Sequence, residues 1–173
     1  YVNELADRAI FAVKDADDTQ LLYTTECIAG TWANPRKANG LIGKRQDFPF
    51  FLSDGITLYY AAEDTEGLGG YDIYVAQYDA EENVFRTSEN LGMPFNSPAN
   101  DYLCIIDETR NIGWLATDRR QPADSVCIYT FIPTQTRTTY DPILVGEDAL
   151  RNYAQILCLK DSQADLYTRT QTN

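Results

Sequence analysis

The sequence predicts an all-β fold made of a repeated four-stranded unit, and three observations lead to that expectation. Residues 48–79 contain three strand-like runs separated by two turn or loop signals, SDG and DTEGLGG. Weaker copies of this stretch lie on either side of it, about 50 to 55 residues away, which is the spacing of an internal repeat. Helical periodicity is found only near the end of the chain, so a single C-terminal α-helix is expected after the strands.

The best-defined unit covers residues 47–98. Its first expected strand, 48–52, is aromatic and apolar, and the second, 56–62, has the composition of a strand buried on both faces. The third, 71–78, is rich in aromatic and β-branched residues. A polar fourth strand at 84–87 suits the edge of a sheet.

The turns of this unit are defined by residues that favour turns for physical reasons. Glycine adopts positive φ at little cost, and Asp and Ser bond to the backbone of neighbouring residues. Three glycines within seven residues require a loop before the third strand. The residues assigned to this structural repeat motif are Ser53, Asp54, Gly55, Gly67, Gly69, Gly70, Asp72 and Tyr74.

The same order of strands is expected in residues 1–46 and 99–146. The earlier unit has strands at 8–14 and 20–29 and takes its innermost strand from Tyr1–Asp7. The later unit has expected strands at 101–107, 112–117, 126–132 and, weakly, 137–140. Residues 147–160 form the expected helix, followed by a polar tail at 161–173. The apolar face of that helix consists of Leu150, Tyr153, Ala154, Leu157 and Cys158.

The spacing of the repeat defines its size. Residues 58–62 match 112–116 at a spacing of 54, whereas Ile73-Tyr74 match Ile128-Tyr129 at 55, which predicts one inserted residue in the loop. This alignment sets Trp114 against Tyr60, so Trp114 is expected in the core. A four-stranded unit of this length has the size of a propeller blade. The sequence therefore predicts a partial β-propeller of about three four-stranded antiparallel blades.

Three blades are too few for a closed ring, because propellers typically have about 4–8. Three solutions stay open from the sequence. Additional blades can complete the ring, two copies can self-associate into six blades, or the exposed sheets of an arc can be capped, for example by the terminal helix.

Residues 47–96 resemble the TolB-type, WD-like propeller repeat, in the form common in bacterial cell-envelope proteins. The residues that carry the resemblance are Phe48-Pro49, Leu52–Gly55, Thr57–Tyr60, Gly67–Tyr74 and Glu89–Gly92. It is fainter over 100–132, where Glu108-Thr109 stands in place of Asp-Gly and residues 119–125 replace the glycine loop, and faintest over 1–43. The resemblance implies a non-enzymatic binding or scaffold module located outside the cytoplasm, in the periplasm or at the outer membrane, with a protein or glycan partner.

Composition excludes several classes of function. The net charge is −12, which opposes nucleic acid, because affinity for phosphates depends on Lys and Arg. There is no His, so Ser-His-Asp and Cys-His catalysis and His-bearing zinc sites are excluded. No apolar run approaches the roughly 20 residues that a transmembrane helix needs. No cofactor is expected, and any catalysis would depend on carboxylates, Tyr, Lys or Cys.

The four cysteines, Cys27, Cys104, Cys127 and Cys158, contain no CxxC pair, so no metal site is expected. Cys27, Cys104 and Cys127 lie inside apolar runs, so buried free thiols are the preferred interpretation, with one or two disulfides as the alternative. Residues 15–18 (DADD) are interpreted as a solvated turn, since Gln20 stands where a calcium loop requires Gly.

Two features of the sequence are candidates for a functional site. Trp32 follows Gly30-Thr31 in a loop and is the one candidate for an exposed aromatic platform that binds a sugar or a peptide. A carboxylate-dependent carbohydrate-active enzyme is the second alternative, and it needs two acids that face each other across a cleft. The acids expected at strand ends are Glu63, Asp107 and Asp118. No catalytic residue is assigned from the sequence.

Overall fold

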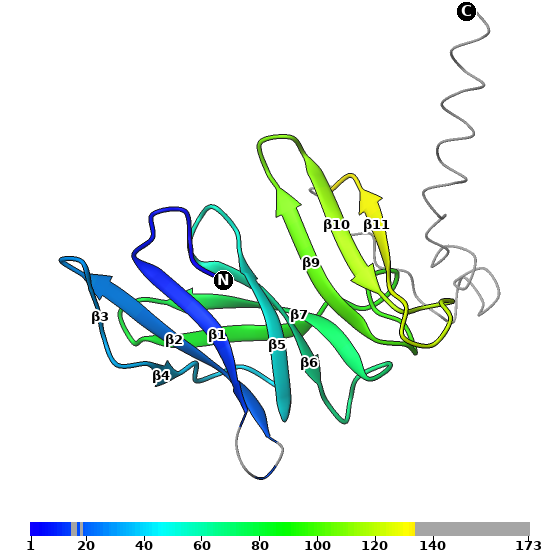
Figure 1. Ribbon diagram of the computed structural model, residues 1–173, viewed down its shortest axis with the longest axis horizontal. Helices are drawn as coiled ribbons and strands as arrows, with labels where there is room; N and C mark the ends of the chain where they lie inside the picture. The colour runs from blue at the N-terminus through cyan, green and yellow to red at the C-terminus, as the bar shows by residue number, and fades with distance from the viewer. Residues whose placement is uncertain (15–16, 18, 134–173) are drawn as a thin grey trace, which may run out of the picture.

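The computed structural model describes residues 1–14, 17 and 19–133, and over this part the chain is all-β, with eleven strands in two sheets (Figure 1). No helix is present among these residues, so the all-β part of the predicted fold class is confirmed for them. The expected strand at 137–140, the helix at 147–160 and the tail at 161–173 lie outside the described residues.

Most strands begin and end within one to three residues of their predicted limits. The larger sheet contains β1 (Arg8–Lys14), β2 (Gln20–Ile28), β3 (Thr31–Trp32), β4 (Arg36–Lys37), β5 (Arg45–Phe51), β6 (Thr57–Glu63), β7 (Tyr71–Asp79) and β8 (Val84–Asn90). The smaller sheet contains β9 (Asp101–Asp107), β10 (Ile112–Thr117) and β11 (Cys127–Phe131). The two-residue strands β3 and β4 were not predicted; both pair with β2.

The larger sheet consists of two antiparallel meanders. The strand order is β1-β2-β5-β6-β7-β8, but β2 and β5 share only one parallel pair, Gln20 with Arg45. The strands therefore fall into three units: the first unit (residues 1–3 and β1–β4), the middle unit (β5–β8) and the last unit (β9–β11).

The N-terminal residues run antiparallel to β1, in the place predicted for the innermost strand of the first unit. Val2 pairs with Ala9, and Tyr1 and Ile10 exchange two backbone hydrogen bonds. The first unit thus contains an extended segment, two long strands and the short β4, which pairs with β2 through Arg36 and Lys37.

The hydrogen-bond register repeats between the middle and last units at a constant spacing. Tyr60 pairs with Tyr74 in the middle unit, and Leu115 pairs with Tyr129 in the last unit. Both spacings are 55 residues, so the predicted spacing of 54 in the second strand is wrong, and so is the predicted inserted residue. Matching by residue type aligned two aromatic side chains, Tyr60 and Trp114, whereas the register aligns Trp114 with Tyr59.

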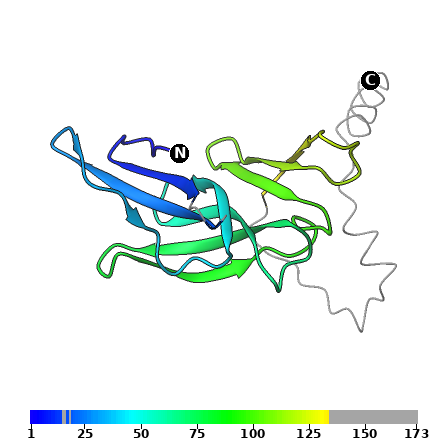
Figure 2. The same cartoon turned by 60° about the horizontal axis from the view of Figure 1, so that its bottom comes forward.

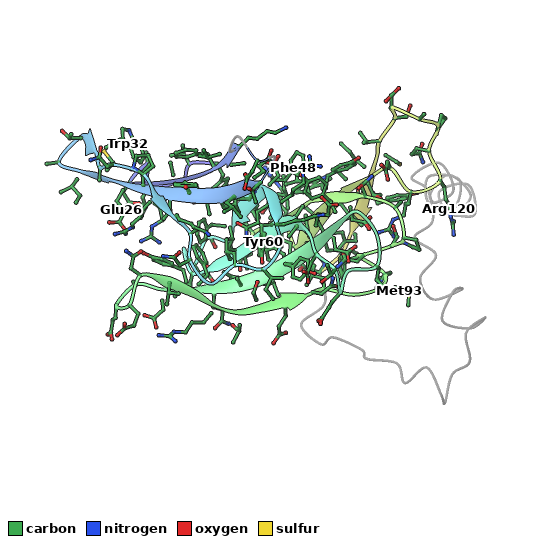
Figure 3. The ribbon with its side chains drawn as sticks, turned by 90° about the horizontal axis from the view of Figure 1, so that it is seen from below. Glu26, Trp32, Phe48, Tyr60, Met93 and Arg120 are labelled. Atoms are coloured by element: carbon green, nitrogen blue, oxygen red, sulfur yellow. The ribbon has the colours of Figure 1, made fainter. Side chains whose placement is uncertain are left out.

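The core lies between successive units, and the middle unit is buried on both faces. One cluster joins Ile10 and Leu22 of the first unit to Tyr60 and Tyr74 of the middle unit. The other joins residues of the middle and last units: Ala61, Ile73, Cys104, Leu115 and Tyr129. Figure 2 shows the first and middle units as separate layers of strands, and Figure 3 shows Tyr60 enclosed within the molecule. Because neighbouring residues of β6 point in opposite directions, this strand contributes to both clusters.

Large and small side chains exchange places between equivalent strand pairs of the middle and last units. In the middle unit Leu58 pairs with Ala76, whereas the equivalent pair in the last unit is Gly113 with Phe131. A Cβ atom on Gly113 would lie 2.2 Å from the ring of Phe131. The large side chain has moved to the neighbouring strand, so volume is retained while the residue types differ.

Three cysteines lie within the described residues and all three are free thiols, but the burial expected from the sequence holds for Cys104 alone; Cys158 lies outside these residues. Cys104 is buried, whereas Cys27 and Cys127 are partly exposed. Burial raises the pKa of the Cys104 thiol to about 12.

We expect Cys104 to resist thiol reagents in the folded protein, because the thiolate is the reactive form and the side chain is inaccessible. In a Cys158→Ser variant at pH 8, Cys27 and Cys127 should react with an aromatic disulfide reagent well before Cys104. Peptide mapping after timed quenching identifies the modified residue. Modification of Cys104 as fast as that of Cys27, without denaturant, would contradict the packing described above.

Candidate functional site

A cleft of about 720 Å³ lies where the three units meet at one end of their innermost strands. It is lined by three segments of distant sequence: Tyr1 with residues 3–5, residues 50–55, and residues 105–110 together with Trp114. Figure 1 shows the loops that follow β5 and β9 on the same side of the molecule, with the N-terminus near them. Each of the three units therefore contributes one wall.

Two tight turns form the rim of this cleft. In the turn after β5, the Asp54 carboxylate accepts hydrogen bonds from the backbone N–H of Ile56 and Thr57, both at 2.8 Å, and Gly55 adopts a φ of +66°. In the turn after β9, Asp107 accepts from the backbone N–H of Arg110 at 2.9 Å. Each Asp thus accepts hydrogen bonds from backbone N–H groups of its turn that would otherwise have no partner in the protein.

The two turns are tied to one another across the cleft. The backbone N–H of Ser53 donates to the Glu108 carboxylate at 3.2 Å, and the Ser53 hydroxyl donates to the same oxygen. The Ser53 and Glu108 positions come from different sheets, so this contact fixes the spacing of the rim. Glu108 stands where the resemblance to propeller repeats expects Asp-Gly, and it is used here for a contact between units.

The walls combine aromatic and acidic side chains. Tyr1 packs edge-to-face on Phe50 with ring centroids 5.4 Å apart, and Trp114 lines the cleft from the last unit. The acidic side chains that line it are Glu4, Asp54, Asp107 and Glu108, whereas Arg110 is the one basic side chain in the lining. Arg110 is already paired with Asp107 at 2.9 Å. The cleft is therefore both aromatic and negatively charged.

Two of these acids are held ionised by their turns. Burial acts to raise the pKa of Asp54, but the hydrogen bonds from Thr57 and Ile56 outweigh it, and the net shift is downward. The backbone N–H and the guanidinium of Arg110 lower the pKa of Asp107, against a smaller opposing effect of desolvation. Neither carboxyl has the raised pKa that a general acid requires near neutral pH.

The lowered pKa of Asp54 has a consequence for stability as a function of pH. A carboxyl whose pKa is lower in the folded than in the unfolded state stabilises the fold above its unfolded pKa, about 3.9 for Asp. That contribution is lost as the pH falls through the folded pKa. We therefore expect Asp54→Asn to destabilise the protein at pH 7 and to have less effect near pH 3. Urea unfolding at both values measures this, and an equal loss at both would contradict it.

The three acids expected at strand ends do not converge. Asp107 lines the cleft, whereas Glu63 is the last residue of β6 and Asp118 follows β10, at the ends of these strands away from the cleft. Asp118 accepts hydrogen bonds from the side chains of Asn100 and Tyr102, and Glu63 forms ion pairs with Lys44 and Arg45 at 3.5 and 3.8 Å. The acids that share the cleft were grouped by the fold rather than by any pattern visible in the sequence.

The two tryptophans lie in different parts of the molecule, and one of them lines the cleft. Trp32 is 45% exposed on the β2–β3 hairpin, at the far end of the first unit in Figure 3, and it does not line the cleft. Trp114 was expected in the core, and this expectation is wrong. It is partly exposed and lines the cleft, because the register turns its side chain away from Leu115 and Tyr129.

The remaining repeat-motif residues belong to the middle unit, and none of them lines the cleft. Gly67, Gly69 and Gly70 lie in the β6–β7 loop, whereas Tyr74 is buried in the core between the first and middle units. Asp72 is fully buried and accepts hydrogen bonds from the backbone of Leu68 at 2.6 Å and the side chain of Asn90 at 2.9 Å. A Cβ atom on Gly69 would lie 2.1 Å from the carbonyl oxygen of Ala99, so the loop approaches the next connection closely. Ser53, Asp54 and Gly55 are the motif residues that do line the cleft.

A second aromatic surface, also missed from the sequence, lies near the other end of these strands. The rings of Phe48, Tyr71 and Tyr102 contact one another with centroids 5.6 to 6.0 Å apart, and Arg45 lies 5.6 Å from the Tyr71 ring. Phe48 occupies an irregularity of β5 and has a φ of +50°. A bulge of this kind re-aims a side chain; the Phe48-Pro49 pair is the sequence signal that marks it.

Comparison of the sequence with models of known protein families gives no match, and comparison with curated proteins gives none either. In residues 1–14, 17 and 19–133, no group of three His, Cys, Asp or Glu side chains is placed to hold a metal ion. The same residues contain no helix that is long and apolar enough to cross a membrane. The DADD turn at 15–18 falls almost entirely outside the described residues.

Proposed function

We propose that this chain is a non-enzymatic binding or scaffold module of the bacterial cell envelope, built from propeller blades, whose cleft binds a cationic peptide segment of a protein partner. The observation that supports it is the cleft between Tyr1, residues 50–55 and Trp114, with four acidic side chains against one basic one. Aromatic faces attract Lys and Arg side chains, and a negative cleft concentrates cationic ligands. The location outside the cytoplasm is proposed from the resemblance of residues 47–96 to propeller repeats of the cell envelope.

Tryptophan fluorescence provides a direct test of the proposed ligand. The chain has two Trp residues, so a Trp32→Phe variant leaves Trp114 in the cleft as the one reporter. We expect a lysine-rich decapeptide to change its emission saturably and more weakly as salt is added, because salt screens exposed charges. A glutamate-rich decapeptide and soluble peptidoglycan fragments serve as competing ligand classes. A saturable response to the glycan alone, or none to the basic peptide, would overturn the assignment.

A matched pair of variants locates the binding. Glu4→Gln removes an exposed acid of the cleft, whereas Glu81→Gln removes an exposed acid from the β7–β8 turn. The first should weaken binding of the basic peptide several-fold, and the second should leave it unchanged. Equal effects would show that the peptide responds to the net charge of −12 and not to the cleft.

The alternative of a carboxylate-dependent carbohydrate-active enzyme receives less support. The cleft supplies acids, but Asp54 and Asp107 are each committed to a turn and have lowered pKa values. A glycosidase of the common two-carboxylate type needs one acid that stays protonated near the working pH.

A further inference from the structure

The three units leave one apolar sheet face open at each end of the stack. We call the face of a unit that packs on the following unit its front face, and the face that packs on the preceding unit its rear face. In both internal interfaces a front face meets a rear face: Ile10 and Leu22 pack with Tyr60, and Ala61 and Ile73 pack with Leu115. The front face of the last unit and the rear face of the first unit have no such partner among the described residues.

The open front face of the last unit is equivalent, position by position, to a buried face of the middle unit. Ile128 follows Ile73 by 55 residues in the shared register, and Ala116 follows Ala61 by the same spacing. Ile73 is fully buried, whereas Ile128 is 53% exposed. Ala116 and Ile128 pair directly on this face. The last unit thus carries the same kind of apolar side chains on this face as the middle unit, but no described residue covers them.

The open rear face of the first unit has the same relation to the middle unit. Phe11 pairs with Tyr23 in the first unit, as Tyr60 pairs with Tyr74 in the middle unit. Tyr60 and Tyr74 are 1% and 3% exposed, whereas Phe11 and Tyr23 are only partly buried. Apolar sheet faces of this kind mark contacts with other protein surfaces.

We propose that a second copy of this chain covers both faces, with the last unit of each copy seated on the first unit of the other. Each copy supplies the face that the other lacks, and both new contacts are of the front-to-rear type already present twice within the chain. Head-to-tail contacts form a closed ring when the rotations that relate successive copies add up to a full turn. Two copies related by a two-fold axis meet this condition. Two copies of three units give six units, within the range of about 4–8 for closed rings of four-stranded sheets.

Sedimentation velocity over a wide concentration range tests the proposal. We expect a species of twice the 19.5 kDa chain mass. Association should strengthen with added salt, because the contact is apolar while each chain carries a net charge of −12. Ile128→Glu on the front face and Phe11→Glu on the rear face should each give monomers. Ile56→Glu, at an exposed turn residue outside both faces, is the matched control and should remain dimeric.

Circular dichroism and unfolding midpoints show whether each variant is folded, and the pattern of variants decides the geometry. If only Ile128→Glu dissociates the dimer, the last units pair with each other and the proposed front-to-rear contact is overturned. A wild-type monomer at every concentration also overturns it. So does a monomer in which Ile128→Glu lowers the unfolding midpoint strongly, because the face is then covered within one chain. Mixing the two monomeric variants leaves one intact contact, so partial recovery of dimer is the expected result.

Discussion

Arg119→Met is expected to destabilise the protein by about 3–5 kcal/mol, because it leaves a buried carboxylate without its cation. Arg119 is 9% exposed, and its guanidinium contacts the Asp101 carboxylate, which is fully buried. The same guanidinium donates to the carbonyl oxygen of Pro94 at 2.7 Å and to that of Phe95. One side chain thus joins the start of β9 to the connection that leads into it from the middle unit.

Three further measurements separate the ion pair from a general loss of packing. Burial raises the pKa of Asp101, and the hydrogen bonds from Arg119 oppose that shift. Without Arg119 the carboxyl can take up a proton, so the loss measured by urea unfolding should be smaller near pH 4 than at pH 7. Asp101→Ala combined with Arg119→Met should cost less than the sum of the single changes. Arg110→Met, which removes an exposed partner of Asp107, should have little effect; a similar loss for both arginines would contradict the prediction.

The strands and turns could be predicted because their causes are local. Two short apolar and aromatic runs separated by Ser53-Asp54-Gly55 are sufficient to place β5 and β6, and the structure shows Asp54 bonded to the two backbone N–H groups after the turn. The pairing of residues 1–3 with β1 was also anticipated, since a four-stranded unit lacked one strand. These features depend on residues that are close in the sequence.

The register and the cleft could not be predicted, because both depend on contacts between distant residues. A shift of one residue reverses the face to which each side chain of a strand belongs. Alignment by residue type set Trp114 against Tyr60, whereas the hydrogen bonds set Leu115 there. The Arg119–Asp101 pair is similar: residues 119–125 were noted for lacking glycines, but nothing in the sequence showed which carboxylate Arg119 would reach.

Leu115→Ala and Trp114→Ala test this register directly, because the two residues are neighbours on β10 and point to opposite faces. Leu115 is fully buried between the middle and last units. Removing a buried Leu side chain from a core costs about 2–5 kcal/mol, through lost transfer free energy and the cavity left behind. Trp114 is partly exposed and lines the cleft, so its truncation removes a larger side chain but little of the core between units.

Urea unfolding should therefore show the larger loss of stability for the variant that removes the smaller side chain. Leu115→Ala should lower the free energy of unfolding clearly more than Trp114→Ala does. Both variants are compared at a concentration at which sedimentation shows a single monomeric species, so that loss of association does not add to either value. Leu58→Ala, at the fully buried position in the interface with the first unit, should match Leu115→Ala. If Trp114→Ala cost as much as these two, its ring would belong to a buried core, and its place in the lining of the cleft would be contradicted.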